Sequence, residues 1–236
     1  MKAAPHETAE RVEPVAAVAR FLTGFAHRVK SPLTGVRGYG ELMAREGDGD
    51  RRRYWGERLA GGLESLDRIV ESARRYQLPR ALERRHLCLA TLAGEAWRLA
   101  LQATPGAAAK NCRLALDLDP AAEALVDPFH FRNLLVNLLQ NALDASPAGG
   151  IVRVDARAGE LIGVSDAGPG LAGLDRERIL TPFFTTRPDR AGLGLPVAAE
   201  IAAAHGLALD WQELRPTGLR ARVLRGTGHR HQRSMP

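Results

Sequence analysis

The chain has 236 residues, of which 45% are hydrophobic, enough for one large domain or two small ones with packed cores. Its net charge of +6 would suit nucleic-acid binding, but aromatic residues make up only 5% and the basic residues are scattered among acids. We therefore predict no nucleic-acid partner. No apolar run approaches the length of about 20 residues that a membrane span needs, so we expect no membrane insertion. Cys88 and Cys112 lack C-x-x-C spacing and indicate reduced core thiols in a cytoplasmic protein.

The N-terminal third predicts a helical hairpin. Residues 1–12 are polar, and we expect a disordered lead-in there. Apolar residues then recur every three or four positions from about 15 to 45, and a second such pattern runs from about 55 to 79 after a Gly/Asp-rich turn at 46–50. The stripe of the first helix comprises Val15, Val18, Leu22, Phe25, Val29, Leu33, Val36 and Leu42. We assign residues 13–80 to this hairpin domain.

The two apolar stripes are wider than one hairpin needs, which favours a four-helix bundle built by two chains. A homodimer is therefore the preferred interpretation. The alternative is an intramolecular hairpin packed on the rest of the same chain.

Residues 81–225 alternate between short strands and helices, which predicts an α+β domain with helices on one face of a mixed sheet. Helices are expected at 92–103, 129–145 and 196–205. Strands are expected at 86–89, 112–118, 124–126, 151–154, 161–164, 207–211 and 219–224. We expect residues 226–236 to be a disordered basic tail.

Three blocks in this second domain carry polar chemistry. Asn133, Asn137 and Asn141 are four positions apart on one helix edge, and a carboxamide oxygen suits a magnesium ion already neutralised by nucleotide phosphates. The same asparagines could simply face water. Asp166 follows an apolar strand and opens Asp-Ala-Gly-Pro-Gly, where a carboxylate could accept a hydrogen bond from the amine of adenine.

The third block is Thr-Pro-Phe-Phe-Thr-Thr-Arg at 181–187, followed by Gly192-Leu193-Gly194 at the start of a predicted helix. Glycines at a helix N-terminus expose backbone N–H groups to phosphate. Each of the last two blocks alone could be a tight turn or a flexible entry to a helix.

His27 lies beside the apolar stripe, and a lone histidine there is most often an ordinary surface or core residue. However, the box Phe-Ala-His-Arg-Val-Lys-Ser-Pro-Leu together with the three later blocks resembles two-component sensor histidine kinases. The ATP-binding part is similar to the domain they share with type II topoisomerases and mismatch-repair ATPases, and Pro-Phe-Phe-Thr-Thr is most similar to the nitrogen-regulation type. The resemblance covers residues 15–224.

The resemblance implies a soluble homodimeric kinase that phosphorylates His27 from ATP with Mg²⁺ and passes the phosphoryl group to an aspartate of a response regulator. No sensor region is recognisable, so we expect the signal to come from a separate partner protein, from the C-terminal tail or from the dimer itself. Asn141 would bind Mg²⁺, supported by Asn137. The implied nucleotide-binding residues are Asn137, Asn141, Asp144, Asp166, Gly168, Gly170, Phe184, Thr185, Thr186, Arg187, Gly192, Leu193 and Gly194. Hydrolases of this superfamily have a water-activating glutamate where this chain has Asn137, so the sequence favours a kinase.

The sequence departs from the family pattern at several positions. Arg28 stands where most members have an acid that accepts the imidazole proton, and Ser31 stands where Asn or Thr is usual, which puts phosphatase activity in doubt. Arg190 replaces a lid glycine, and Pro32 is expected to bend the first helix. A pseudokinase or phosphotransfer adaptor is therefore an alternative, as is a serine kinase of anti-sigma type, although that class lacks the histidine hairpin.

Overall fold

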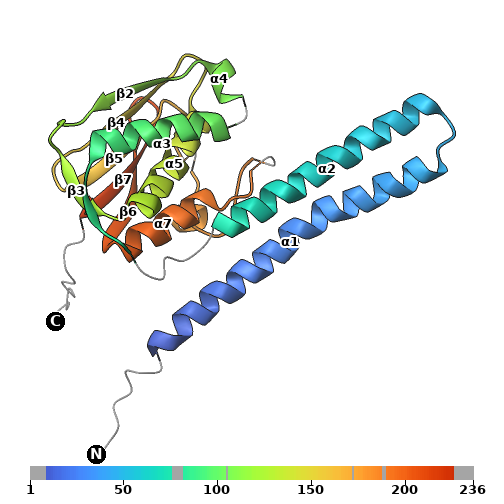
Figure 1. Ribbon diagram of the computed structural model, residues 1–236, viewed down its shortest axis with the longest axis horizontal. Coiled ribbons are helices and arrows are strands. Elements are labelled where there is room, and N and C mark those ends of the chain that lie inside the picture. Colours follow the sequence, from blue (N-terminus) through green and yellow to red (C-terminus); the bar gives the residue numbers. More distant parts are fainter. Residues whose placement is uncertain (1–8, 76–81, 105, 172, 188–189, 226–236) are drawn as a thin grey trace, which may run out of the picture. The chain divides into compact units, whose positions relative to one another are not determined.

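The computed structural model describes residues 9–75, 82–104, 106–171, 173–187 and 190–225 (Figure 1). The chain folds into two compact units. The first, which we call the hairpin unit, comprises residues 1–77 and 181–193. The second, which we call the sheet unit, comprises residues 78–180 and 194–236. The catalytic blocks expected from the sequence are thus divided between the two units.

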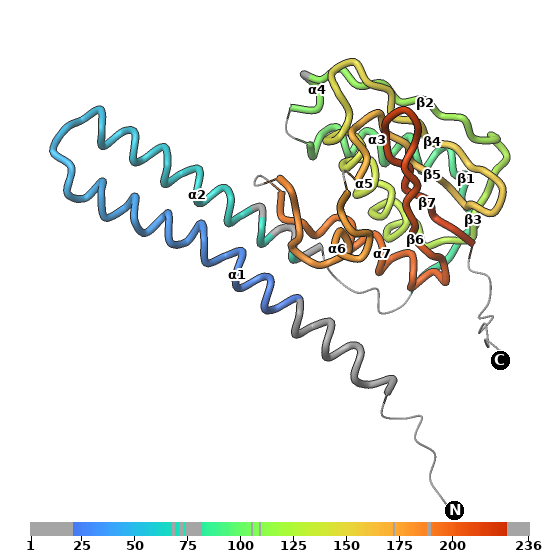
Figure 2. Tube along the Cα trace, turned by 180° about the vertical axis from the view of Figure 1, so that it is seen from behind, coloured from blue at the N-terminus to red at the C-terminus, as the bar shows by residue number. Residues whose placement is uncertain are grey.

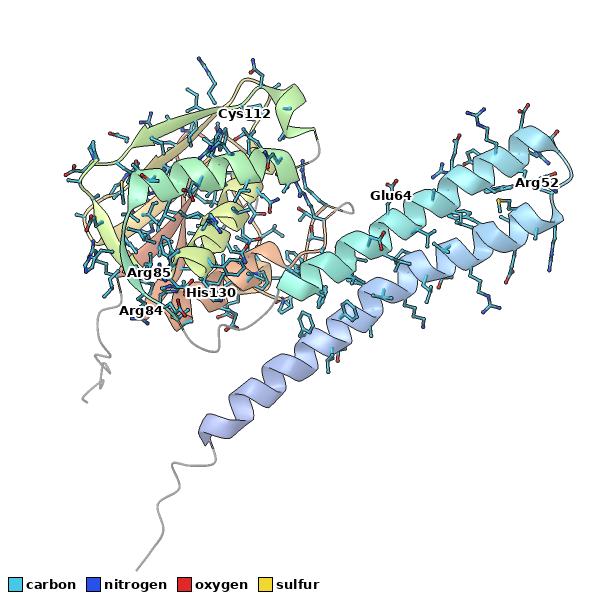
Figure 3. The ribbon with its side chains drawn as sticks, in the orientation of Figure 1. Arg52, Glu64, Arg84, Arg85, Cys112 and His130 are labelled. Carbon is cyan, nitrogen blue, oxygen red and sulfur yellow. The ribbon has the colours of Figure 1, made fainter. Side chains whose placement is uncertain are left out.

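The hairpin unit contains two long helices, α1 (Ala9–Arg45) and α2 (Gly49–Arg75). Helix α1 starts at Ala9, within the lead-in expected at 1–12, and residues 1–8 and the predicted tail at 226–236 lie outside the described part. At the turn, Asp48 Oδ1 accepts a hydrogen bond from Arg51 N–H (2.9 Å), and the Arg52 guanidinium donates to the Glu46 carbonyl (2.6 Å; Figure 3). The first bond caps the N-terminus of α2, and the second joins α2 to the turn that precedes it. No helix among the described residues combines the length and apolarity that crossing a bilayer requires.

The two helices approach closely at Gly62, where a Cβ atom would lie only 2.6 Å from Val36 Cγ2. Tyr39 and Trp55 stack at 5.9 Å between ring centroids nearer the turn. Yet six large apolar side chains of this unit remain between 46% and 57% exposed. They are Leu22, Leu33, Leu42, Tyr54, Leu63 and Val70. The hairpin therefore leaves much of its predicted stripe uncovered.

The sheet unit contains a five-stranded sheet in the order β2-β4-β5-β7-β6 (Figure 2). Strands β2 and β4 are parallel, and the other neighbours are antiparallel, so the sheet is mixed as predicted. A separate antiparallel pair is formed by β1 and β3. The strands are β1 (Arg85–Cys88), β2 (Arg113–Asp117), β3 (Glu123–Val126), β4 (Ile151–Asp155), β5 (Glu160–Ser165), β6 (Leu207–Glu213) and β7 (Leu219–Arg225).

One face of this sheet is covered by α3 (Leu89–Ala103), α5 (Pro128–Ala145) and α7 (Gly194–Ala204), with α5 packed between the other two (Figure 1). Apolar residues of α5 are fully buried at helical spacing and form the centre of the core. They include Phe131, Leu134, Leu135, Leu138, Leu139 and Leu143. The α+β class is confirmed. Two short helices, α4 (Ala107–Lys110) and α6 (Arg176–Ile179), were not predicted, because four residues are too few to show helical periodicity.

The opposite face of the sheet carries a buried charge cluster. Arg220 on β7 is fully buried, forms ion pairs with Asp155 and Glu160, and donates to Ser165 Oγ at 3.0 Å. Its guanidinium occupies the space above Gly163, where a Cβ would lie 2.3 Å from Nη2. Glycine on β5 is therefore required by the arginine on the neighbouring strand.

Both cysteines are free and half-buried. The Sγ atom of Cys88 lies 3.5 Å from the Pro120 carbonyl oxygen, and that of Cys112 lies 3.5 Å from the Pro147 carbonyl oxygen. The expectation that they belong to the core was wrong, because Cys88 joins the end of β1 to the start of α3, Cys112 directly precedes β2, and neither is buried.

Candidate functional site

His27 lies on α1 with an exposed side chain, as its place beside the apolar stripe predicts. Ser31, one turn later, is also exposed, and α1 continues as a helix through Pro32. An exposed imidazole can be approached by a reactant and can exchange its proton with water. The helix therefore presents His27 to solvent.

Arg28, the neighbour of His27, is not presented in the same way. Its Nη2 donates to the main-chain carbonyl of Arg190, within the hairpin unit, and its Nε is buried without a hydrogen-bond partner among the described residues. Burial lowers the pKa of the Arg28 guanidinium, although the group remains a cation at neutral pH. Arg28 thus binds the segment 181–193 and cannot act as a proton acceptor.

A second contact joins the same segment to α1. The ring of Phe183 lies 5.3 Å from that of Phe21 and 6.2 Å from that of Phe25, measured between centroids. Gly24 lies beneath it, and a Cβ at Gly24 would be 2.4 Å from Phe183 Cδ2. Phe183 is buried and adopts a positive φ of 67°, which is unusual for an aromatic residue. The missing side chain of Gly24 therefore makes room for the phenylalanine ring one turn before His27.

The segment 181–193 is also held by hydrogen bonds between its own residues. Phe183 N–H donates to the Gly192 carbonyl at 2.8 Å, and Gly192 has a φ of +71°. A Cβ at Gly192 would meet the Phe184 carbonyl oxygen at 2.6 Å, so only glycine fits there. Thr185 Oγ1 accepts from Arg187 N–H at 3.0 Å, which forms a local turn. Phe184 and Thr185 are half-buried, Thr186 and Arg187 are exposed, and Leu193 is buried.

Helix α5 of the sheet unit places the predicted asparagines along one edge. Asn137 Nδ2 donates to the Asn133 carbonyl at 2.9 Å, which orients its oxygen, and a Cβ at Gly194 would lie 3.1 Å from Asn137 Oδ1. The N-terminus of α7 thus packs against Asn137. Asn141 is exposed, and its carboxamide makes no hydrogen bond with another described residue. Asp144, in the last turn, is half-buried.

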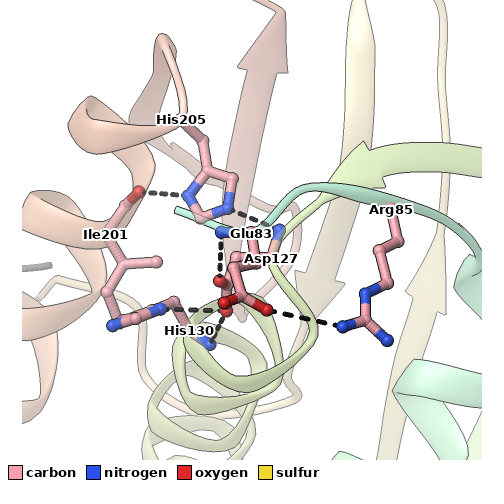
Figure 4. A network of polar contacts seen from close by, with 6 residues as sticks. All are labelled: Glu83, Arg85, Asp127, His130, Ile201 and His205. Carbon is pink, nitrogen blue, oxygen red and sulfur yellow. Dashed lines mark hydrogen bonds and ion pairs between the residues drawn. The ribbon is translucent and has the colours of Figure 1, made fainter. Parts of the chain in front are cut away.

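The N-terminus of α5 is anchored by the polar network in Figure 4. Asp127 Oδ1 accepts from His130 N–H and from the His130 ring, both at 2.9 Å, and Oδ2 accepts from Glu83 N–H at 2.9 Å. Burial alone would raise the pKa of Asp127, but these hydrogen bonds outweigh it and lower the pKa to about 2. The carboxylate is therefore a strong cap for the helix.

His205 completes this anchor. Its Nε2 accepts from Asp127 N–H at 3.0 Å, while its Nδ1–H donates to the Ile201 carbonyl at 2.8 Å. Burial lowers the pKa of His205 and favours this neutral tautomer. A protonated ring would place an N–H against the N–H of Asp127.

Asp166 follows β5 and is fixed by backbone donors. Its Oδ1 accepts from Gly168 N–H at 2.8 Å and from Leu219 N–H at 3.2 Å. Burial raises the pKa of Asp166, and these two hydrogen bonds partly oppose the shift. Gly168 is buried against the end of α5, where a Cβ would lie 2.8 Å from the Cβ and from the carbonyl oxygen of Ala145. Gly170 has a φ of +76°, as a sharp turn requires.

The structure therefore brings Asn137 together with Gly194, and the last turn of α5 together with the Asp166 loop. Two residues of the hairpin unit were missed by the sequence reasoning, Gly24 and Phe183. Phe183 belongs to the Pro-Phe-Phe motif, which indicated it only as a neighbour of Phe184. The contact of Gly24 with Phe183 could not be predicted, because the sequence around a helical glycine does not show which side chain packs against it.

Two family models match the chain. Residues 17–79 match the His Kinase A (phospho-acceptor) domain. Residues 126–227 match the Histidine kinase-, DNA gyrase B-, and HSP90-like ATPase. The two matched regions contain, respectively, His27 and the blocks around Asn141, Asp166 and Gly192.

Curated relatives with similar sequences are sensor kinases. Sensor histidine kinase ZraS of Escherichia coli O157:H7 is 30% identical over 221 residues, which cover 89% of this chain and 46% of the relative. Signal transduction histidine-protein kinase AtoS of Escherichia coli (strain K12) is 27% identical over 200 residues, covering 83% of this chain and 32% of the relative. The chain thus spans less than half the length of these relatives.

Solved structures show the same fold. Histidine kinase ThkA in complex with response regulator protein TrrA aligns with a TM-score of 0.68 and 22% identity, covering 94% of this chain and 65% of that one. Full-length ShkA in complex with AMPPNP aligns with a TM-score of 0.55 and 25% identity, covering 87% of this chain and 44% of that one.

Proposed function

The chain belongs to the histidine kinase family, whose transmitter module it contains, and from this premise we propose that it transfers the γ-phosphoryl group of ATP to its own His27. The observation that carries the proposal is the exposed imidazole of His27 on the helix that matches the phospho-acceptor domain. We assign residues 13–80 to the acceptor hairpin and 81–225 to nucleotide binding.

The proposed nucleotide site is built mainly from the sheet unit. Asp166, held by two backbone N–H donors, would accept a hydrogen bond from the adenine amine, and Gly168 and Gly170 allow the base to approach the backbone. Gly194, the first residue of α7, would expose its N–H group to the phosphates, and the family resemblance implies the same for Gly192. The family resemblance adds residues 184–187 and Leu193 to the nucleotide-binding set.

Magnesium fits this site only as a companion of the nucleotide. Asn141 offers one uncommitted carboxamide oxygen, and the described residues contain no cluster of three or more His, Cys, Asp or Glu that could hold a metal ion. A single neutral ligand cannot retain Mg²⁺ unless phosphate oxygens and water supply the rest. When bound, the ion would neutralise charge on the phosphates, with Asn137 supporting Asn141.

In the proposed reaction a neutral ring nitrogen of His27 attacks the γ-phosphorus. A P–N bond forms, the bond from the γ-phosphorus to the bridging oxygen breaks, and ADP leaves with that electron pair. The proton on the imidazole passes to water, because His27 is exposed and Arg28 cannot accept it. Asn137 cannot activate water for hydrolysis, which favours transfer to His27.

We further propose that two chains form a four-helix bundle and that phospho-His27 donates to an aspartate of a separate response regulator. The exposed apolar residues of α1 and α2 support the dimer, because six of them are about half exposed in one chain. Sedimentation that shows only monomers at micromolar concentration would contradict it.

The test is incubation of the full chain with Mg-ATP labelled at the γ-phosphate, followed by acid and alkali treatment. A phosphohistidine is lost in acid and kept in alkali, and it should be absent from His27→Gln but present in His86→Gln, which replaces another exposed histidine. Absence of label in a chain that binds ATP would favour the adaptor function instead.

A further inference from the structure

The side chain of Lys110 binds the C-terminal end of α5, the helix that carries Asn133, Asn137 and Asn141. This lysine is the last residue of α4, and its ammonium nitrogen lies 2.9 Å from each of three main-chain carbonyl oxygens. These belong to Leu143, Asp144 and Ser146, at the end of α5. The last carbonyls of a helix lack partners within the helix and attract cations. Lys110 thus satisfies three of them from outside the helix.

The ammonium group has no donor left for another ligand. It carries three N–H bonds, and each has a carbonyl acceptor at 2.9 Å. The backbone adds to this link, because Gly149 N–H donates to the Lys110 carbonyl at 2.7 Å. Lys110 is therefore committed to holding the helix end and is not poised to bind a phosphate.

The turn that Lys110 holds also contacts the Asp166 loop. Gly168 approaches Ala145 so closely that a Cβ would be 2.8 Å from its Cβ and its carbonyl oxygen. Gly168 N–H in turn donates to Asp166 Oδ1. A continuous set of contacts therefore runs from Lys110 through the last turn of α5 to Asp166.

The other end of α5 is fixed independently by Asp127 and His205. Since the N-terminal end has its own anchor, Lys110 acts on the final turn of the helix, next to Asn141. Loss of the ammonium group would leave three partly buried carbonyls unsatisfied at that turn and let it fray.

We propose that Lys110 is a positioning residue for Mg-ATP, which sets the distance between Asn141 at the phosphate end of the nucleotide and Asp166 at the adenine end. This inference rests on the proposed function. It predicts that Lys110 matters for a ligand that engages both ends together, and much less for a ligand that engages one end.

The test is calorimetric titration of the full chain and of Lys110→Met with three ligands: Mg-ATP, ATP in EDTA, and adenosine. Arg113→Met is the matched control, because it removes one positive charge from an exposed side chain three residues away. We expect Lys110→Met to weaken Mg-ATP binding by about tenfold, with the other two ligands and the control changed by less than about twofold. Lys110→Arg, which keeps the charge but is planar, should recover part of the Mg-ATP affinity.

Three outcomes would overturn the inference. Unchanged Mg-ATP affinity in Lys110→Met would make the lysine a helix cap with no bearing on the nucleotide. An equal loss with ATP in EDTA would mean that the effect of Lys110 does not depend on the Mg²⁺ end of the nucleotide, which contradicts the proposed role. If Lys110→Met fails to fold, Lys110→Arg takes its place in the test. A folded Lys110→Arg that binds Mg-ATP with full affinity, and whose ATP affinity depends on Mg²⁺ as in the wild-type chain, would contradict the positioning role. Failure of the wild-type chain to bind Mg-ATP would instead reject the proposed function.

Discussion

Replacing Gly24 by alanine should separate the segment 181–193 from α1. The added Cβ would lie 2.4, 3.1 and 3.3 Å from three carbons of the Phe183 ring, whereas carbon atoms in contact are normally about 3.5–4.0 Å apart. The ring must therefore withdraw by roughly 1 Å or leave its place on the helix. Full burial of a phenylalanine contributes about 1.5–3 kcal/mol, and Phe183 is only 8% exposed. Most of that stabilisation should be lost.

The same substitution should stabilise the helix itself, because alanine is favoured over glycine within a helix by about 1 kcal/mol. Gly38→Ala is the matched control. It lies on the same helix, and a Cβ there would meet no atom within 4 Å. Both variants should raise the stability of α1, and only Gly24→Ala should release Phe183.

Hydrogen exchange measured by mass spectrometry distinguishes these effects. The amides of Phe183 and Phe184 are hydrogen-bonded within the segment, to the carbonyls of Gly192 and Thr181. A loss of about 1.5–3 kcal/mol corresponds to roughly 10- to 100-fold faster exchange of these amides in Gly24→Ala. Equal exchange in Gly24→Ala and Gly38→Ala would refute the contact between Phe183 and Gly24.

Three further predictions concern the sheet unit. Gly168→Ala should weaken Mg-ATP binding by about tenfold or more in calorimetric titration, because its Cβ would collide with Ala145 and displace the Asp166 loop. Arg220→Met should lower the free energy of unfolding by about 3–5 kcal/mol in urea titration, because it leaves two buried carboxylates without their cation. The free energy of unfolding should also fall as the pH drops below about 6.5, because His205 is neutral in the fold and binds a proton more readily when unfolded. The slope from this group cannot exceed about 1.4 kcal/mol per pH unit, and it should disappear in His205→Gln.

The sign of the pH effect follows from the lowered pKa of His205. Above the pKa that His205 has in the unfolded chain, its ring is neutral in both states, and its contribution to the free energy of unfolding is fully present. As the pH falls toward the lower folded pKa, the unfolded state takes up the proton first, so stability is lost. An unchanged slope in His205→Gln would assign the effect to another group. For the other two variants, normal nucleotide affinity in Gly168→Ala, or a loss below about 1 kcal/mol in Arg220→Met, would contradict the packing described.

Much of the fold could be predicted from the sequence because periodicity reports which face of an element is buried. Helix α5 has buried leucines and asparagines on opposite sides, so both its existence and its bounds were close to the prediction. The hairpin of β6 and β7 was predicted from alternation in the same way. The parallel pairing of β2 with β4 could not be predicted, because it joins strands that are separated by a helix and by β3.

The site was predictable where one residue type carries the chemistry. His27, Asn141 and Asp166 were indicated by their local motifs, although their roles stay predictions. Contacts between distant segments gave no such signal. The three carbonyls that Lys110 binds are main-chain atoms, which every residue has, so no pattern of side chains could indicate them.

The two arginines that depart from the family pattern are best understood together. Arg28 and Arg190 are 162 positions apart, yet the Arg28 guanidinium donates to the Arg190 carbonyl. A carboxylate at position 28 has no N–H to donate, so it could not form a hydrogen bond with that carbonyl. Arg28 therefore contacts the segment 181–193, in which Phe183 is buried. Because the acceptor in this link is a main-chain atom, exchanging Arg190 alone should preserve it, whereas exchanging Arg28 for an acid should break it. The arginine at position 28 thus fixes the segment 181–193 to α1, a role that an acid at this position could not fill.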